Sequence, residues 1–259
     1  MWPFCAALLS VRERASMFHV KHLHEHPALQ PDAIASVLAA SGVTVTTRQA
    51  EMLGMHAALV LEANRVVNLT RITEPDAVVR LHILDSLLPL VYESLDGHSV
   101  VDVGSGAGFP GIPLAILGHD VTCCEARKKK AAVIAEISGV LDLPVPVIAQ
   151  RAEELAIGES RWDVVVMRAV SSLGALMELA APLLTPGGRL LAMKGVRQAE
   201  EEERAAKVSA IVGLTLREVY EYSLGDGDEA RSLYVYQRTG SPRVALPRRS
   251  GLAQTQPLG

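Results

Sequence analysis

Cysteine is scarce in this sequence, and long hydrophobic runs are missing from it. Three cysteines occur in 259 residues, and two of them, Cys123 and Cys124, are adjacent, an arrangement that rarely forms a disulfide. No apolar run approaches the roughly 20 residues that a membrane-spanning helix needs. The apolar start, WPFCAALLS, follows no basic residue and is a poor signal peptide. The sequence therefore predicts a cytoplasmic protein with reduced thiols and no membrane segment.

An excess of positive charge is missing as well. The net charge is −4, which argues against a protein that binds polyanions over its whole surface. Any contact with nucleic acid must come from local basic clusters, each of which could equally be a solvated surface. Three clusters occur: Arg127, Lys128, Lys129 and Lys130; Arg168 with Lys194 and Arg197; and Arg243 with Arg248 and Arg249.

Four regions follow one another along the chain. Residues 1–30 have the composition of a loose arm, and its histidines lack the cysteine or carboxylate neighbours of a metal site, so we expect no metal. Residues 31–95 show helical patterns and are predicted to form a helical cap. Residues 96–239 form the main domain, and residues 240–259 are a basic, proline-rich tail that we expect to be irregular.

Short apolar runs recur within residues 96–239. They read SVVDV, DVTCCE, PVPVIA, WDVVVMR and GRLLAMKG, with helix-sized segments between them. Apolar runs without alternation mark strands buried on both faces, hence a parallel sheet with helices on either side. Two further runs, LTLREVYEYSL and ARSLYVYQR, predict a terminal antiparallel pair. The combination resembles the class I S-adenosylmethionine-dependent methyltransferase fold, a Rossmann-like α/β domain with a mostly parallel seven-stranded sheet and a terminal antiparallel strand.

The glycine turn after the first predicted strand can be aligned with two patterns. Gly106 to Gly111 fits the dinucleotide pattern G-x-G-x-x-G, but that alignment starts late after the strand, and two prolines in the next helical turn remove N–H donors that a pyrophosphate needs. The other alignment is Asp102-x-Gly104-x-Gly106-x-Gly108, with an acid for an ammonium group and glycines against which a thioether can lie. S-adenosylmethionine has that ammonium group and no phosphate, so the second alignment is favoured.

Side chains with useful chemistry follow the other predicted strands, where ligands of open α/β sheets bind. Glu125 stands about 20 residues beyond the glycines, where an acid would bind the ribose hydroxyls of either cofactor. Ala152 and Glu153 follow the third strand, where the protein would bind the edge of adenine. A helix N-terminus alone also favours an acid at this position and could explain Glu153. Arg168 and Lys194 follow the fourth and fifth strands. A cation at the end of a buried strand is costly unless it has a partner, so we predict that these two carry the chemistry.

Seven motifs, in order, resemble those of one enzyme family. They are NLT (68–70), HILDS (82–86), VDVGSGAGFPGIPLAI (101–116), RAEEL (151–155), MRAVSSL (167–173), MKG (193–195) and the C-terminal LPRRSGLAQTQPLG. From about residue 50 onward the chain is similar to ribosomal RNA small subunit methyltransferase G, also called glucose-inhibited division protein B. The resemblance implies S-adenosylmethionine-dependent methylation of guanine N7 in the decoding-region loop of 16S ribosomal RNA, with free RNA or the small ribosomal subunit as partner.

The resemblance also adds to the predicted binding sites. It implies cofactor contacts at Gly104, Phe109, Ala152 with Glu153, and Arg168, while Glu125 stands where many members carry Asp. The full set predicted for the cofactor is Asp102, Gly104, Ser105, Gly106, Gly108, Phe109, Glu125, Ala152, Glu153 and Arg168. The set predicted for RNA is Arg127, Lys128, Lys129, Arg197, Arg248 and Arg249.

The expected chemistry agrees with the motifs that the sequence does not carry. Guanine N7 offers a lone pair and bears no proton, so its methylation needs alignment rather than a general base. The Asn/Asp-Pro-Pro-Tyr motif of amino-methylating enzymes is absent, and Cys123 and Cys124 lie within a strand, where core packing is their expected role. Two other readings stay open, an NAD-dependent oxidoreductase and a non-enzymatic regulator that binds RNA or a cofactor. We expect a monomer.

Overall fold

The computed structural model describes residues 26–168, 170–225 and 229–258. Most of the predicted N-terminal arm, with His19, His22 and His24, lies outside these residues. None of the described helices is long and apolar enough to cross a bilayer.

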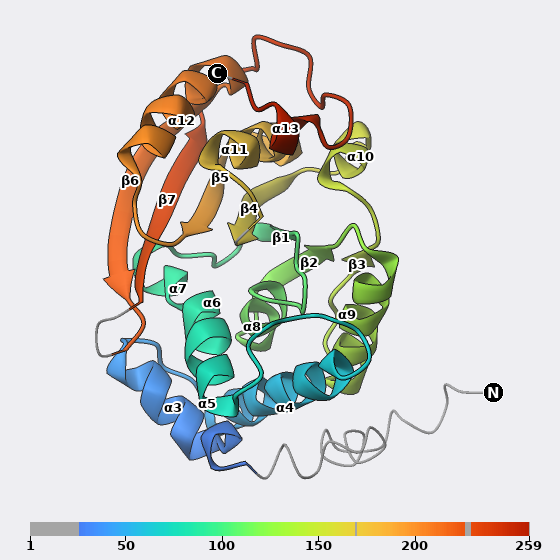
Figure 1. Ribbon diagram of the computed structural model, residues 1–259, viewed down its shortest axis with the longest axis vertical. Helices are drawn as coiled ribbons and strands as arrows, with labels where there is room; N and C mark the ends of the chain where they lie inside the picture. The colour runs from blue at the N-terminus through green and yellow to red at the C-terminus, as the bar shows by residue number, and fades with distance from the viewer. Residues whose placement is uncertain (1–25, 169, 226–228, 259) are drawn as a thin grey trace, which may run out of the picture.

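The helical cap predicted for residues 31–95 is present. Its elements are η2 (Pro27–Leu29), α3 (Pro31–Ala40), α4 (Thr47–Asn64), α5 (Pro75–Val78), η3 (Val79–Leu84), α6 (Asp85–Leu87) and α7 (Pro89–Tyr92). A capping box at Thr46 and Gln49 begins α4: the Thr46 hydroxyl accepts the Gln49 N–H, and the Gln49 side chain accepts the Thr46 N–H. In Figure 1, α3, α4 and α5 lie at one end of the molecule, and α6 and α7 lead from them toward the sheet, with α6 beside α8.

One helix of the cap departs from the regular pattern that its sequence predicts. The segment η3, between α5 and α6, is a π-helical turn, so the Asp85 N–H reaches back five residues to the Arg80 carbonyl. A π turn widens the helix and re-aims its side chains, and such turns are frequent at functional sites. Residues 82–86 of the HILDS motif fall on this turn and on α6.

The main domain contains a seven-stranded sheet, as predicted. The strands are β1 (Ser99–Val103), β2 (Asp120–Cys124), β3 (Val147–Ile148), β4 (Trp162–Arg168), β5 (Leu184–Lys194), β6 (Leu214–Ser223) and β7 (Ala230–Arg238). Their spatial order is β3-β2-β1-β4-β5-β7-β6, and only the pairs that include β7 are antiparallel. The third strand is shorter than the run PVPVIA suggests, β5 begins four residues before the run GRLLAMKG, and the other five match their apolar runs closely.

Two hydrophobic cores lie on opposite faces of the sheet. The first joins inward side chains of β1 and β4, such as Val100 and Val164, to the cap and to α8 (Gly111–Ile116) and α9 (Lys128–Val140). The second joins the alternate residues, such as Val101 and Val165, to the helices of the other face. Those helices are α10 (Ala152–Ile157), α11 (Leu173–Ala180), η4 (Ala181–Leu183), α12 (Ala199–Val212) and α13 (Leu252–Thr255) (Figure 1).

The basic tail is attached to the domain, which differs from the loose segment that its composition suggests. The Arg248 guanidinium donates to both oxygens of Glu178 on α11, each at 2.6 Å, and the Glu178 side chain is only 2% exposed. The Gly251 N–H donates to Glu153 Oε1 on α10 at 2.7 Å. Ala253 on α13 is buried. The tail therefore ties α10 and α11 together.

Candidate active site

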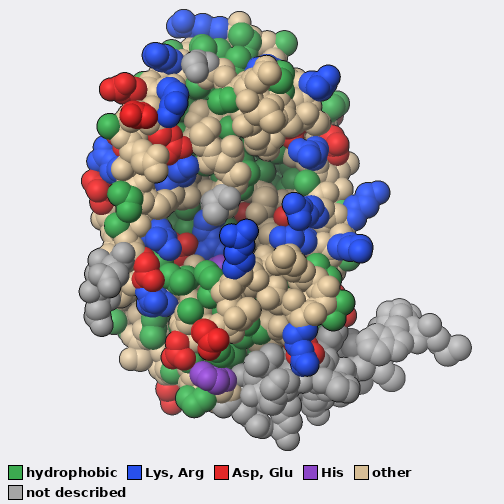
Figure 2. All heavy atoms as spheres, in the orientation of Figure 1, with side chains coloured by type: hydrophobic (Ala, Val, Ile, Leu, Met, Phe, Trp, Pro, Cys, Tyr) green, Lys and Arg blue, Asp and Glu red, His purple; other side chains and the backbone are tan. Residues whose placement is uncertain are grey.

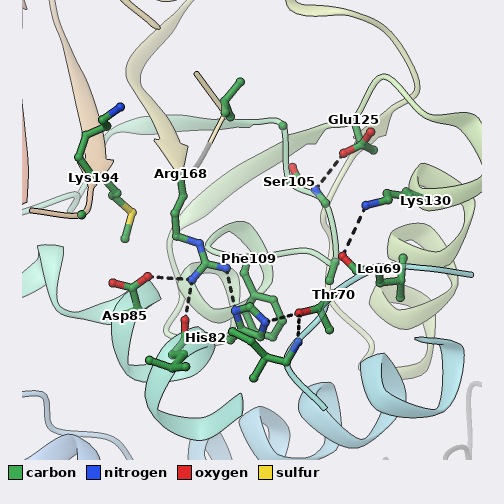
Figure 3. A pocket seen from close by; sticks show the side chains of 18 of the residues that line it. Leu69, Thr70, His82, Asp85, Ser105, Phe109, Glu125, Lys130, Arg168 and Lys194 are labelled. Carbon is green, nitrogen blue, oxygen red and sulfur yellow. Dashed lines mark hydrogen bonds and ion pairs between the residues drawn. The ribbon is translucent and has the colours of Figure 1, made fainter. Parts of the chain in front are cut away.

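A cavity of about 740 Å³ opens at the carboxyl ends of β1, β2, β4 and β5. It lies where the strand order reverses between β1 and β4, the usual ligand site of such sheets. Lys and Arg side chains gather around the hollowed middle of the face shown in Figure 2, and Figure 3 shows the cavity from close by. It is lined by Leu69, Thr70, Ile72, Leu81, His82, Asp85, Gly104, Ser105, Gly106, Ala107, Phe109, Glu125, Arg127, Lys130, Arg168, Val170, Met193, Lys194, Gly195 and Arg231.

The glycine turn forms one wall of this cavity, and five of its backbone N–H groups already donate within the protein. The N–H groups of Gly104 and Ser105 donate to the Cys124 carbonyl, and those of Gly108 and Phe109 donate to the Ser105 carbonyl. The Gly106 N–H donates to Glu125. A pyrophosphate needs free N–H groups at such a turn. The turn is therefore shaped for a ligand without phosphate, in agreement with the second glycine alignment.

Backbone geometry explains why glycine is needed at Gly104. Its φ is +82°, a region that other residues rarely adopt, and an added Cβ would lie 2.7 Å from Val170 Cγ2. The turn thus packs against Val170, two residues beyond the end of β4.

Asp102 has a different position from the one predicted for it. It is 1% exposed and does not line the cavity, and its Oδ2 accepts the Gly111 N–H at the start of α8 at 2.8 Å. Burial raises the pKa of this carboxyl from 3.8 to about 6. Asp102 therefore holds the first turn of α8 beneath the glycines, and it does not face a ligand ammonium group.

Glu125 lies in the cavity, as the sequence predicts. Its Oε2 accepts the Gly106 N–H at 2.9 Å and its Oε1 accepts the Arg127 N–H at 2.8 Å. Each carboxylate oxygen has two lone pairs, so both oxygens keep one for a ligand hydroxyl. Two backbone amides thus fix the direction of this carboxylate, and Figure 3 marks the bond from Gly106.

Arg168 is held at the cavity by three groups of the cap. Its Nη1 donates to Asp85 Oδ2 at 3.0 Å and to the Leu81 carbonyl at 3.2 Å, and its Nη2 lies 3.2 Å from His82 Nδ1. All three acceptors come from the π turn or from the residue directly after it. The anionic partner that a buried cation requires is therefore Asp85, a neighbouring acid, which also lies 3.4 Å from Arg231 Nε.

An aromatic stack supports this guanidinium. Phe109 lies between His56 and His82, with ring centroids 4.4 and 4.7 Å away, and the Arg168 guanidinium lies 5.5 Å from the Phe109 centroid. Burial lowers the pKa of His56 to about 4. Burial and then the charge of Arg168 lower the pKa of His82 to about 3, so both rings are neutral near pH 7.

Lys194 stands at the opposite side of the cavity from Glu125. Its Nζ donates to Glu201 Oε1 and to the Ser171 carbonyl, at 2.8 and 2.9 Å. Lys194 also lines a second cavity of about 620 Å³ between α11, α12 and the tail. Lys194 is therefore an ion-paired cation at the boundary between the two cavities.

The thiols are not placed for catalysis. Cys123 and Cys124 are buried, and burial raises the pKa of Cys124 to about 12 and that of Cys123 as well. A thiol with such a pKa stays protonated and is a poor nucleophile. Their role is core packing. Within the described residues, no group of three or more His, Cys, Asp or Glu side chains has a metal-binding arrangement.

The cavity collects part of the predicted set. Gly104, Ser105, Gly106, Phe109, Glu125, Arg127, Arg168 and Lys194 line it. Asp102, Gly108, Ala152, Glu153, Lys128, Lys129, Arg197, Arg248 and Arg249 do not. Glu153 is 5% exposed and accepts the Gly251 N–H of the tail, so its side chain has a structural partner.

Two predicted RNA contacts also have acidic partners. Arg197 donates to both oxygens of Glu202 and to Glu221, and it remains partly exposed. Arg248 is paired with the buried Glu178. A guanidinium whose N–H groups already bind carboxylates is a weaker site for phosphate than Lys128 and Lys129 at the start of α9, which have no acidic partner among the described residues.

Thr70, His82, Asp85 and Arg231 line the cavity without having been predicted to do so. Three of them lie in motifs already noticed, Thr70 in NLT and His82 and Asp85 in HILDS, but the sequence did not show that a helix of the cap would reach the sheet. The spacing of His82 and Asp85 is i, i+3, which places them on one helical face. This spacing is the feature of the sequence from which a shared position of His82 and Asp85 could have been predicted.

The sheet order, the glycine turn and the site at the strand ends together define a class I S-adenosylmethionine-dependent methyltransferase. Among solved structures, a glycopeptide N-methyltransferase complexed with sinefungin is similar, with a TM-score of 0.51 and 12% sequence identity over 60% of this chain and 93% of that one. At this identity the likeness shows the fold alone.

The sequence profile of the rRNA small subunit methyltransferase G family (GidB) matches residues 49–227. A ribosomal RNA small subunit methyltransferase G from Sorangium cellulosum is 42% identical over 194 residues, 72% of this chain and 80% of that one. Another from Carboxydothermus hydrogenoformans is 35% identical over 225 residues, 84% of this chain and 95% of that one. The chain belongs to this family of rRNA-methylating enzymes, and the oxidoreductase and regulator readings are not favoured.

Proposed function

We propose that this enzyme transfers a methyl group from S-adenosylmethionine to N7 of a guanine in the decoding-region loop of 16S ribosomal RNA. The observation that carries the proposal is the state of the acids and of the imidazole that line the cavity. His82 is bonded to Arg168 and Thr70, Asp85 to two arginines, and Glu125 to two amides. A site in which each basic group has a fixed partner suits an acceptor that loses no proton, and N7 is such an acceptor.

The residues of the glycine turn fit the proposed cofactor. The ribose hydroxyls would bind the free lone pairs of Glu125, and the thioether would lie against the glycines between Gly104 and Gly108. Bound S-adenosylmethionine would supply a methyl group that the N7 lone pair accepts while the sulfonium becomes a neutral thioether. Ser105 and Phe109 would complete the cofactor side of the cavity.

The charges on the substrate side suit a base that becomes cationic. Methylation at N7 leaves a positive charge on the guanine, which a bare arginine would oppose. Asp85 lies against both Arg168 and Arg231 and offsets part of their charge, so Arg168 can donate hydrogen bonds to the base with less of this repulsion. Its contribution is to hold the base in line, and Lys194, paired with Glu201, is suited to the same task.

RNA binding would follow the basic edge of the cavity. Arg127 and Lys130 line the cavity, and Lys128 and Lys129 lie next to them at the start of α9. Phosphate contacts of this kind position a substrate without reading its sequence. We also propose that the enzyme works in the cytoplasm as a monomer, which sedimentation of the pure protein would test.

The test is a methyl-transfer assay with radiolabelled S-adenosylmethionine. Small ribosomal subunits from a strain without this modification are compared with naked 16S transcript and with subunits that already carry it, and the modified base is mapped. We expect label on one guanine of the unmodified RNA and none on the modified subunits. Label at another base, or binding of NAD in place of S-adenosylhomocysteine, would refute the proposal.

A further inference from the structure

His82 occupies a central place in the cavity. Its ring is bonded at both nitrogens: Nδ1 lies 3.2 Å from Arg168 Nη2, and Nε2 lies 2.8 Å from Thr70 Oγ1 (Figure 3). Because a guanidinium can only donate, Nδ1 is the acceptor and Nε2 carries the hydrogen that Thr70 accepts. The ring therefore links the loop before α5 to the end of β4.

Thr70 is itself fixed, so the link has a rigid end. Its N–H donates to Asn64 Oδ1 at the end of α4 at 2.9 Å, and its Oγ1 also accepts the Ile72 N–H at 3.1 Å. The face of the imidazole packs on Phe109 with an angle of 17° between the rings. Position and orientation of His82 are thus determined by contacts on three sides.

We propose that His82 is a positioning residue for methyl transfer, which turns the Arg168 guanidinium toward the substrate base by accepting one of its hydrogens. This inference rests on the proposed function, and it assigns His82 a role that is exerted through Arg168. The neutral state of the ring, which burial maintains, keeps Nδ1 available as an acceptor.

A count of donors shows why a third acceptor matters. The guanidinium has five N–H groups, of which Asp85, the Leu81 carbonyl and His82 take three. Asp85 and Leu81 both bind Nη1 and so hold one end of the planar group. The bond from Nη2 to His82 holds a second nitrogen and therefore limits small rotations that two bonds at one atom resist less well. The remaining two N–H groups, which have no partner within the described part of the chain, then keep one direction in the cavity.

The experiment compares His82→Asn with His82→Gln. The asparagine oxygen can take the place of Nδ1 and accept from Arg168, whereas the glutamine amide nitrogen can take the place of Nε2 and donate to Thr70. Both variants lose the stack on Phe109, so this loss cancels in the comparison. Glutamine is the better helix former, and an effect on helix stability alone would make His82→Gln the milder change.

We expect the kcat of methyl transfer to fall about tenfold or more in His82→Gln and by about threefold or less in His82→Asn, since a hydrogen bond to a charged group is lost only in the first. Affinity for S-adenosylhomocysteine should stay within about threefold in both, because the cofactor side of the cavity is unchanged. His98→Gln, at an exposed position just before β1, is the matched control and should behave as the wild type.

The other outcomes overturn the proposal. Equal losses in the two variants would mean that the ring acts through packing, and a milder His82→Gln would mean that helix stability decides. If neither variant folds, Thr70→Ser and Thr70→Val test the same link from its other end. The valine variant should then be slower than the serine variant by about tenfold, and equal rates would refute the role. A wild-type protein that transfers no methyl group would overturn the proposed function, and this inference with it.

Discussion

Replacing Arg248 with alanine should destabilise the whole domain, although the residue lies in the proline-rich tail. Its guanidinium covers both oxygens of Glu178, whose side chain is 2% exposed, while that of Arg248 is 22% exposed. The change would leave a buried carboxylate with the Leu258 N–H, at 3.4 Å, as its remaining partner among the described residues.

The size of the effect follows from the burial of the pair. Breaking a buried ion pair by removing one partner costs about 3–5 kcal/mol, and the partial exposure of Arg248 favours the lower end, about 3 kcal/mol. For a protein of this size, that corresponds to a fall in Tm of roughly 6–12 °C.

Urea unfolding of the wild type, Arg248→Ala and Arg249→Ala would measure this directly. Arg249 is the adjacent, exposed arginine, and its loss should change the free energy of unfolding by less than about 0.5 kcal/mol. A double change to Arg248→Met and Glu178→Leu should restore most of the stability, because it removes both charges. If Arg248→Ala and Arg249→Ala unfolded at the same urea concentration, the tail would be a loose appendage and its arginines would be free for RNA.

Four further predictions concern the cavity and its edge. Arg168→Ala should slow methyl transfer about a hundredfold, and Arg168→Lys should restore little activity because an ammonium point charge cannot replace the planar guanidinium. Single-turnover rates on unmodified subunits would measure both effects. Near-normal transfer by Arg168→Ala would mean that Arg168 is only a structural ion-pair residue. Asp102→Asn should be stabilising at neutral pH, because burial raises the pKa of Asp102 from 3.8 to about 6. As pH rises from about 4 to about 6, the free energy of unfolding of the wild type should therefore fall by roughly 2–3 kcal/mol relative to that of the variant. Urea midpoints that kept a constant difference over this window would contradict the prediction. Changing both Lys128 and Lys129 to glutamine should weaken RNA binding and lower the slope of log affinity against log salt by about 1–2, and an unchanged slope would place the RNA elsewhere. Gly104→Ala should abolish binding of S-adenosylhomocysteine in calorimetry, because the Cβ meets Val170 at a positive φ, and normal affinity would refute the role of this turn.

The sequence was sufficient to predict the sheet, and physical reasons explain why. Strands such as WDVVVMR are buried on both faces and carry their apolar signal in consecutive residues, so each strand can be recognised alone. The glycine turn was recognised from its own residues, and the terminal antiparallel pair pointed to the class I methyltransferase architecture, whereas the order of the strands was not predicted. The family was identified from motifs, and the comparisons confirm it.

The parts that sequence could not predict depend on partners far apart in the chain. Asp102 looked like a ligand for an ammonium group because it precedes the glycines, yet the N-terminus of α8 folds back onto it. Arg248 and Glu153 looked like RNA and cofactor contacts, but each meets a partner 70 or more residues away. The π turn that brings His82 to Arg168 has no recognisable sequence pattern of its own.

The N–H groups of the glycine turn, which already donate within the protein, affect how well other small molecules of a cell could bind in the cavity. ATP, GTP and NAD share adenine, guanine or ribose with the ligands proposed for this cavity, and all of them carry phosphate. The turn offers such groups few donors, because Gly104, Ser105, Gly106, Gly108 and Phe109 already donate within the protein. Placing a phosphate there would strip it of water without replacing the lost hydrogen bonds, which is costly. Cellular nucleotides would therefore compete poorly for the cavity. The fraction of enzyme with bound cofactor would depend on the concentration of the methyl donor rather than on that of ATP or GTP.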